Sequence, residues 1–221
     1  MKFKPNQPNT GDGVNLLAGI KPSSAALVIF DPQYRSVLDK MNYGNEGKRQ
    51  KARAALTAMS DQTISLFINM IERCIRPSGH MMIWTDKFIV ASGHHLKWQI
   101  PQSLRLVDMM VWQKPRIGMG YRLRRKSEFL LIFQKEPCRA KGTWIDHGIP
   151  DVMSEAPVPG HAHAKPIGIQ SRLIEAVTLP SDLVVDTCAG SYSVLSAVRR
   201  LSRRRLYLGC DLKPFKFRRP E

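Results

Sequence analysis

The sequence predicts an α/β protein with a mostly parallel open sheet and helices on both faces. Continuous apolar runs such as Ala25–Phe30 suit buried strands, and they alternate with segments of helical periodicity such as Asp61–Arg76. The 221 residues are enough for a sizeable core, and 43% of them are hydrophobic. No internal repeat or linker divides the chain, so we expect a single domain over residues 1–221.

Each expected element follows from its local pattern. Short apolar runs predict strands over residues 25–30, 80–85, 106–114, 128–135, 182–186 and 205–210. Helical spacing of apolar side chains predicts helices over residues 61–76, 167–179 and 194–201, with a short helix or turn at 14–20. Pro77 and Gly79 are expected to end the first long helix. Residues 38–54 and 136–160 are expected to be loops because they are polar or rich in glycine and proline.

The charge of the chain indicates its partner. Thirty-four Lys and Arg residues stand against 18 Asp and Glu residues, a formal net charge of +16. An excess of this size favours a polyanion, most often nucleic acid. Two basic segments are the candidate contacts, although either could be a solvated surface: one includes Arg35, Lys48 and Arg49, and the other includes Arg116, Tyr121, Arg122, Arg124, Arg125 and Lys126.

Several classes of protein are disfavoured by composition. The four cysteines are scattered without a C-x-x-C pair, which is typical of reduced thiols in a cytoplasmic protein, and the six histidines show no zinc-ligand spacing with them. We therefore expect no metal site. No apolar run reaches the length of a membrane helix, so we expect no membrane partner.

The first candidate site follows the apolar run 25–30, where the chain continues as Asp31-Pro32-Gln33-Tyr34. Aspartate and proline are common turn residues, so a simple turn is one interpretation. The other interpretation is an active-site corner, because ligands of open α/β sheets bind beyond the carboxyl ends of the strands. The tetrapeptide alone does not decide between the two.

A second candidate corner follows the strand that ends at Asp186. Small residues come next, among them Gly190, whose missing side chain lets a ligand approach the backbone. About 20 residues later another strand runs into Asp211, and an acid there can accept hydrogen bonds from ribose hydroxyls. This pattern predicts a nucleotide-like ligand. No G-x-G-x-x-G follows any strand, which disfavours a dinucleotide-dependent oxidoreductase.

These segments together resemble the DNA amino-methyltransferases that use S-adenosylmethionine, in the arrangement in which the catalytic motif precedes the cofactor motif. Asp31–Tyr34 resembles their Asp-Pro-Pro-Tyr, and residues 186–193 resemble their Asp-Pro-Phe-x-Gly-Ser-Gly-Thr. Three further segments match in order: Thr10–Asp12 with Leu16 and Leu17, the Trp-x-Lys strand and Glu-containing strand of residues 112–135, and His161–Pro166, which resembles His-Pro-Thr-x-Lys-Pro.

The resemblance implies a Rossmann-like class I methyltransferase fold with a seven-stranded, mostly parallel sheet. It implies S-adenosylmethionine as cofactor and double-stranded DNA as partner. The catalytic residues that it implies are Asp31, Pro32, Gln33 and Tyr34. The cofactor-binding residues that it implies are Asp12, His161, Lys165, Asp186, Cys188, Ala189, Gly190, Ser191 and Asp211.

The resemblance also bears on the target base and on specificity. In the family an Asp at the first motif position goes mainly with adenine N6, and a Ser mainly with cytosine N4, so Asp31 favours adenine. The 151 residues between Tyr34 and Asp186 leave no room for a separate target-recognition domain. We therefore expect low sequence specificity, as in compact phage and prophage enzymes. The sequence leaves open whether the protein is a monomer or a homodimer.

Some positions depart from the motifs. Gln33 replaces a proline, Thr187 and Cys188 replace Pro-Phe, and Tyr192 replaces a glycine, so that it either crowds the cofactor or replaces the missing aromatic wall. The alternatives are a catalytically impaired homologue that still binds nucleic acid, methylation of cytosine N4, and methylation of adenine in RNA. The RNA enzymes usually have Trp where Tyr34 stands, which favours DNA.

Overall fold

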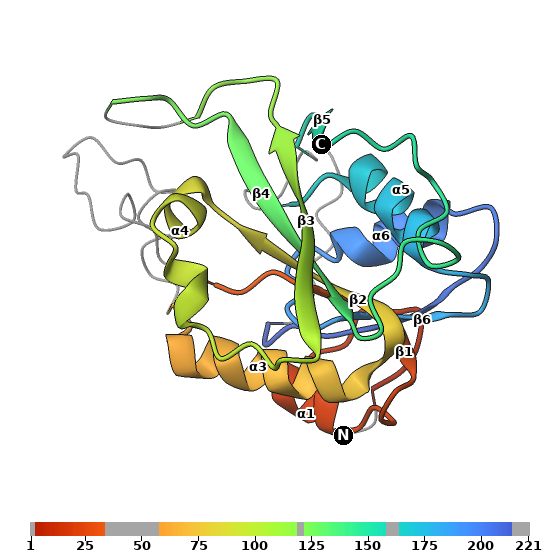
Figure 1. The fold of residues 1–221 in the computed structure, drawn as a ribbon. Coiled ribbons are helices and arrows are strands. Elements are labelled where there is room, and N and C mark those ends of the chain that lie inside the picture. The colour runs from red at the N-terminus through yellow and green to blue at the C-terminus, as the bar shows by residue number, and fades with distance from the viewer. Residues whose placement is uncertain (1–2, 34–57, 119–121, 158–163, 214–221) are drawn as a thin grey trace.

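The computed structural model describes residues 3–33, 58–118, 122–157 and 164–213, and a seven-stranded sheet lies at its centre (Figure 1). The strands follow the order β5-β3-β4-β2-β1-β6-β7 across the sheet. Their bounds are β1 Ala25–Phe30, β2 Ile75–Thr85, β3 Leu104–Gln113, β4 Ser127–Lys135, β5 Val152–Ser154, β6 Leu183–Asp186 and β7 Leu206–Gly209. Within these residues β4 runs antiparallel to β2 and β3, and the other neighbouring pairs are parallel. This confirms the predicted class of fold.

Helices cover both faces of the sheet, as Figure 1 shows. One face packs against α1 (Gly13–Ala18) and α3 (Asp61–Cys74), and its core includes the stacked rings of Phe30 and Phe67, 5.1 Å apart. The other face packs against α5 (Ile167–Val177) and α6 (Ser193–Arg200). The short helices α4 (Lys87–Ala91) and η2 (His94–Lys97) follow β2. Two apolar faces explain why β1 is buried at every position.

The predicted end of the first long helix is wrong in detail. Helix α3 ends at Cys74 and β2 begins at the next residue, so Pro77 and Gly79 lie inside a strand. A side chain at Gly79 would come within 2.9 Å of the Ala26 carbonyl oxygen on β1, where the pairing register shifts. Glycine is therefore needed for a close approach of two strands, a contact that local sequence does not show.

Three short elements differ from the sequence-based expectation. Strand β5 lies within the predicted loop 136–160, and α4 and η2 lie in a segment for which the sequence predicts neither helix nor strand. Each has five residues or fewer, so hydrophobic periodicity is too short to indicate it. Asp86 begins α4, because its carboxylate accepts hydrogen bonds from the amides of Phe88 and Ile89.

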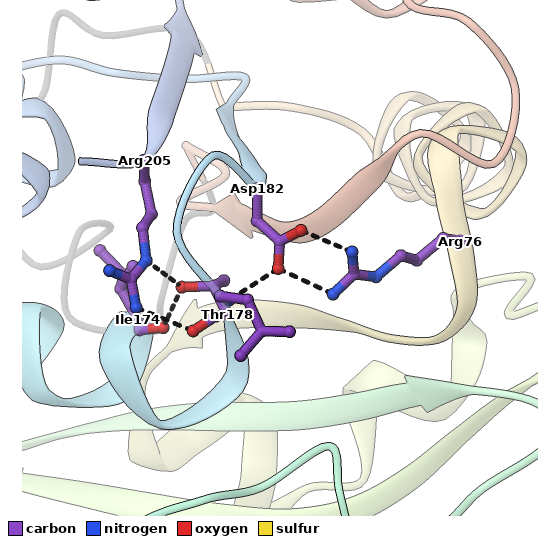
Figure 2. Close-up of polar contacts among 6 residues, drawn as sticks. Arg76, Ile174, Thr178, Asp182 and Arg205 are labelled. Atoms are coloured by element: carbon purple, nitrogen blue, oxygen red, sulfur yellow. Dashed lines mark hydrogen bonds and ion pairs between the residues drawn. The ribbon is translucent and has the colours of Figure 1, made fainter. Parts of the chain in front are cut away.

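Two arginines hold the edge of the sheet at which β2, β6 and β7 begin (Figure 2). Arg76 donates two hydrogen bonds to the carboxylate of Asp182, at 2.6 and 2.8 Å. Arg205 is 5% exposed and donates to the carbonyl oxygen of Thr178 at 2.8 Å and to its hydroxyl at 3.0 Å. It thereby satisfies a carbonyl group at the end of α5.

We expect Arg205→Met to lower the free energy of unfolding by about 1–3 kcal/mol, because the Thr178 carbonyl oxygen loses its buried donor. Urea unfolding measures the change. The matched control is Arg204→Met, since Arg204 is exposed, and its effect should stay within about 0.5 kcal/mol. Equal effects of the two substitutions would contradict the structural role of Arg205.

Candidate active site

The register of the parallel strands brings the two predicted corners together. Strand β1 lies between β2 and β6, with Ile29 opposite Asp186 and Phe30 opposite Ile83. Asp31, directly after β1, therefore emerges at the edge where β6 ends. Because β7 pairs with β6 in parallel, Asp211 follows at the same edge.

The second corner forms a cradle of backbone and carboxylates after β6. Gly190 has a φ of +48°, and no atom lies within 4 Å of the position where a side chain would begin, so the cradle is open there. Its amide donates to the Asp211 carboxylate at 2.9 Å, and the Ala189 amide donates to the Cys210 carbonyl oxygen at 3.0 Å. Cys188 and Ser191 are half-buried beside them.

The amino-terminal segment completes the cradle. Thr10 forms a parallel β-bridge with Asp211, and the Gly11 amide donates to the Asp211 carbonyl oxygen at 2.9 Å. Asp12 then begins α1, since its carboxylate accepts a hydrogen bond from the Val14 amide at 2.7 Å. Three predicted cofactor residues, Asp12, Asp186 and Asp211, thus come from separate segments to one edge of the sheet.

Asp186 is the most buried carboxyl group of the cradle, at 2% exposed. Burial raises its pKa to about 8, and the nearby charge of Asp31 acts in the same direction. The Tyr207 hydroxyl lies 3.3 Å from its Oδ2 atom. Additional positive charge at this edge stabilises the ionised form of Asp186, so the site favours a cationic ligand.

The first corner is held by an ion pair. The Lys165 ammonium lies 2.9 Å from Oδ2 of Asp31 and 3.2 Å from Oε2 of Glu128. Pro32 is buried and Gln33 is exposed, and the Gln33 carbonyl oxygen accepts a hydrogen bond from the Met59 amide at 2.7 Å. Lys165, which the resemblance assigns to the cofactor, therefore contacts Asp31, the carboxylate that the resemblance assigns to catalysis.

Glu128 was not among the predicted site residues. Burial by itself raises the pKa of Glu128, but the ammonium groups of Lys165 and Lys114 lower it to about 2. Burial disfavours the ammonium of Lys165 in turn, yet Asp31 and Glu128 outweigh this effect and raise the Lys165 pKa. The Glu-containing strand noted in the resemblance is the sequence signal that could have identified Glu128.

Tyr192 differs from both expectations for it. The residue has a φ of +56°, a left-handed conformation that explains the glycine of the family motif at this position. Its ring is 2% exposed, in the core beneath α5 and α6, and its hydroxyl donates to the Asn9 carbonyl oxygen. The tyrosine thus ties the start of α6 to the amino-terminal segment of the cradle.

The second basic segment is an extension of the β3–β4 hairpin, which projects beyond the sheet in Figure 1. The Lys114 amide donates to the Lys126 carbonyl oxygen at 2.7 Å, so backbone pairing continues past the strands. Its exposed cations are Arg116, Arg122, Arg124 and Lys126. Arg125 turns inward instead: it lies 3.6 Å from Oδ2 of Asp86 and 5.4 Å from the centre of the Phe88 ring.

Some predicted residues lie outside the described residues. These are the catalytic-corner residue Tyr34, the cofactor residue His161 and the nucleic-acid contacts Arg35, Lys48, Arg49 and Tyr121. The loop predicted over residues 38–54 lies there too. In the part of the chain that the structure describes, no helix is long and apolar enough to cross a membrane.

The sheet order and the site at its carboxyl edge define a class I methyltransferase fold. The PvuII DNA methyltransferase (cytosine-N4-specific) has a TM-score of 0.67 and 16% identity, over 96% of this chain and 86% of that one. The M1.HpyAVI–SAM complex has a TM-score of 0.61 and 16% identity, over 94% of this chain and 93% of that one. At such low identity these structures establish the fold.

The family follows from a more similar sequence. The type II methyltransferase M.HhaII of Haemophilus parahaemolyticus is 46% identical over 209 residues, which span 94% of this chain and 91% of that protein. The chain therefore belongs to the type II DNA methyltransferases, which use S-adenosylmethionine. No protein-family model matches the sequence.

The cradle fits this cofactor. S-Adenosylmethionine carries a sulfonium and an ammonium group, and the carboxylates of Asp12, Asp186 and Asp211 complement these charges and its ribose hydroxyls. The open position at Gly190 allows a ligand to contact the backbone. These residues would hold the cofactor beside Asp31.

We expect Asp186→Asn to change the pH dependence of stability. The raised pKa means that between about pH 4 and pH 8 the folded Asp186 binds a proton that the unfolded chain has lost, so the contribution of this group to stability falls as pH rises. The free energy of unfolding of the variant minus that of the wild type should therefore increase with pH in this window. Urea unfolding at several pH values measures it.

The control for this experiment is Asp151→Asn, because Asp151 is an exposed carboxyl group away from the cradle. Its difference from the wild type should stay nearly constant over the same pH range. A constant difference for Asp186→Asn would contradict a buried, proton-binding carboxyl group at this position.

Proposed function

We propose that the protein transfers a methyl group from S-adenosylmethionine to the N6 amine of adenine in double-stranded DNA. The observation that carries this proposal is the Asp31 carboxylate, which follows β1 and lies at the same sheet edge as the cofactor cradle. In the resembling family, Asp at this position goes mainly with adenine. The fold and the family leave cytosine N4 as the alternative target.

Methyl transfer from this cofactor requires little acid–base catalysis by the protein. The cofactor would supply an activated methyl group. The target nitrogen would form one bond to this carbon as the methyl–sulfur bond breaks with its electron pair left on sulfur, and the nitrogen would then release one proton to solvent. The exocyclic amine is a poor nucleophile because its lone pair is conjugated with the ring. The Asp31 carboxylate and the Pro32 carbonyl oxygen can accept hydrogen bonds from this amine, which frees the lone pair and stabilises the positive charge that develops on nitrogen.

The base must first leave the duplex, because an amine inside the stack is out of reach of the corner. In this proposal Tyr34 stacks on the extruded base, as the motif of the family implies. Pro32 is buried and the Gln33 carbonyl oxygen binds the Met59 amide, so the backbone of the corner is fixed before the base arrives. A fixed corner limits the loss of entropy when the amine is oriented.

DNA binding is assigned to the β3–β4 hairpin and to the basic segment with Arg35, Lys48 and Arg49. The exposed hairpin residues Arg116, Arg122 and Arg124 are suited to phosphate contacts, which position DNA without reading its sequence. The chain has no segment that we assign to a separate target-recognition domain. We therefore propose one domain with low sequence specificity.

The first test is to incubate the protein with unmethylated duplex DNA and labelled S-adenosylmethionine and to identify the modified nucleoside by mass. We expect N6-methyladenine in many sequence contexts. N4-methylcytosine would overturn the choice of base. Bound DNA without any methylated base would favour the impaired homologue, and a product in RNA alone would favour the RNA alternative.

Asp31→Ala tests the catalytic corner directly. We expect kcat to fall by about 10²–10³-fold or more, because the variant has no carboxylate to accept the amine hydrogen bond. The affinity for DNA, measured by fluorescence anisotropy, should remain within about threefold, since phosphate contacts supply most of it. Turnover at the wild-type rate in this variant would refute the role of Asp31.

A third experiment addresses the hairpin. If about 6–10 phosphates are contacted, the affinity of the wild type should fall ~10³–10⁵-fold between 50 and 200 mM salt. Substituting Gln for the three hairpin arginines Arg116, Arg122 and Arg124 should reduce the slope of log K against log salt by about 0.9 for each phosphate that is no longer neutralised. The matched control replaces three exposed arginines at the opposite edge of the sheet: Arg105, Arg139 and Arg204. Equal slopes for both triple variants would contradict the assignment.

A further inference from the structure

Four charged side chains form a line of alternating sign that begins at the catalytic corner. Asp31 pairs with Lys165 at 2.9 Å, Lys165 with Glu128 at 3.2 Å, and Glu128 with Lys114. Asp31 follows β1, Glu128 lies on β4, Lys114 follows β3, and Lys165 precedes α5. Segments distant in sequence thus contribute one charge each to a single row.

Two tryptophan rings lie beneath the two ammonium groups. Nζ of Lys165 is 5.6 Å from the centre of the Trp84 ring, and Nζ of Lys114 is 4.6 Å from that of Trp112. The two rings contact each other edge to face, with centres 6.0 Å apart. Aromatic faces attract cations at these distances, so both lysines are held at defined places in the row.

The backbone at Lys165 is also fixed. Pro166 directly precedes α5, and two amides of its first turn, at Gly168 and Ile169, donate to the Glu155 carboxylate at 2.9 and 2.7 Å. The indole of Trp112 donates to the Glu155 carbonyl oxygen at 2.9 Å. Lys165 is only 8% exposed, so the surrounding residues restrict its side chain. Its contact with Asp31 is therefore fixed by the packing of the site.

The row has a consequence for how Asp31 binds an amine. A carboxylate that neutralises an ammonium group by itself is a weaker acceptor for another donor, because part of its charge is already compensated. Glu128 attracts the same ammonium group at a comparable distance. Because Glu128 also attracts the Lys165 ammonium group, Asp31 does not compensate that cation alone and keeps more of its own negative charge for an amine on which positive charge develops.

We propose that Lys165 and Glu128 are positioning residues for Asp31. Lys165 orients the catalytic carboxylate through its Oδ2 atom, and Glu128 shares the ammonium group so that Asp31 retains the charge needed to bind the target amine. This inference rests on the proposed function. It gives Lys165 a role at the catalytic corner in place of the cofactor contact that the resemblance implies.

The variants Lys165→Met and Glu128→Gln test the proposal because they change Asp31 in opposite directions. Without Lys165, Asp31 loses the ammonium group that lies 2.9 Å from its Oδ2 atom, so its carboxyl should titrate at a higher pH. Without the Glu128 charge, the ammonium group acts on Asp31 alone, and the carboxyl should titrate at a lower pH. Carbon-13 NMR of the Asp31 carboxyl, recorded without cofactor or DNA, measures both midpoints.

The same variants are assayed for methyl transfer. We expect the acidic limb of the kcat–pH profile to move in the same opposite directions, and kcat to fall by up to about 10²-fold as the carboxylate loses its orientation or charge. The affinity for S-adenosylhomocysteine, measured by calorimetry, should stay within about threefold of the wild type. A merely structural defect would shift the acidic limb of the kcat–pH profile in the same direction in both variants, or would shift it in neither.

The control is Glu72→Gln, which breaks a comparably buried pair between Glu72 and Lys135 at 2.9 Å, outside the row. It should leave the Asp31 midpoint unchanged. Unchanged midpoints in both test variants overturn the proposal, as does a tenfold loss of S-adenosylhomocysteine affinity in Lys165→Met at unaltered kcat. Failure of the proposed function has a different signature, the absence of N6-methyladenine from the wild-type product. The NMR midpoints test the inference whatever the base.

Discussion

The position of β1 between two parallel neighbours is the constraint on which the site depends. Because β1 is buried on both faces, Asp31 is the first residue after the strand at which a charge can reach the edge of the sheet. A half-buried carboxylate there needs a compensating cation, and Lys165 supplies it at 2.9 Å. The same parallel pairing places Asp186 one strand away, so Asp31 and the cradle lie at one edge of the sheet.

Local sequence was sufficient for the long elements and for the residues directly at the strand ends. Continuous apolar runs indicated β1, β4 and β6, and an acid after each of two strands indicated Asp31 and Asp211. What local sequence could not show were pairings between distant residues. Lys165 was assigned by its motif to the cofactor, and only the three-dimensional arrangement places it between Asp31 and Glu128. Gly79 is a second example, because the close approach of β1, and not the local sequence, explains why glycine is needed there.

Net charge proved informative about the partner but not about which arginines can reach it. Arg205 binds the end of α5, Arg76 binds Asp182, and Arg125 contacts Asp86 and Phe88. These three arginines bind groups within the protein, whereas other cations of the β3–β4 hairpin are exposed to solvent. The cradle itself is acidic within a strongly basic chain, so exposed hairpin cations and the cradle carboxyl groups lie at the same edge of the sheet.

The bridge between Thr10 and Asp211 has a consequence for the order of motifs along the chain. It lays a segment near the start of the described chain directly beside one near its end, at the cradle. Joining these segments and opening the chain elsewhere, between the two halves of the sheet, would leave the strand order unchanged while reversing which motif comes first. The edge at which Asp31 and the cradle lie side by side is thus a property of strand pairing, and the fold leaves the linear order of its two halves free to vary.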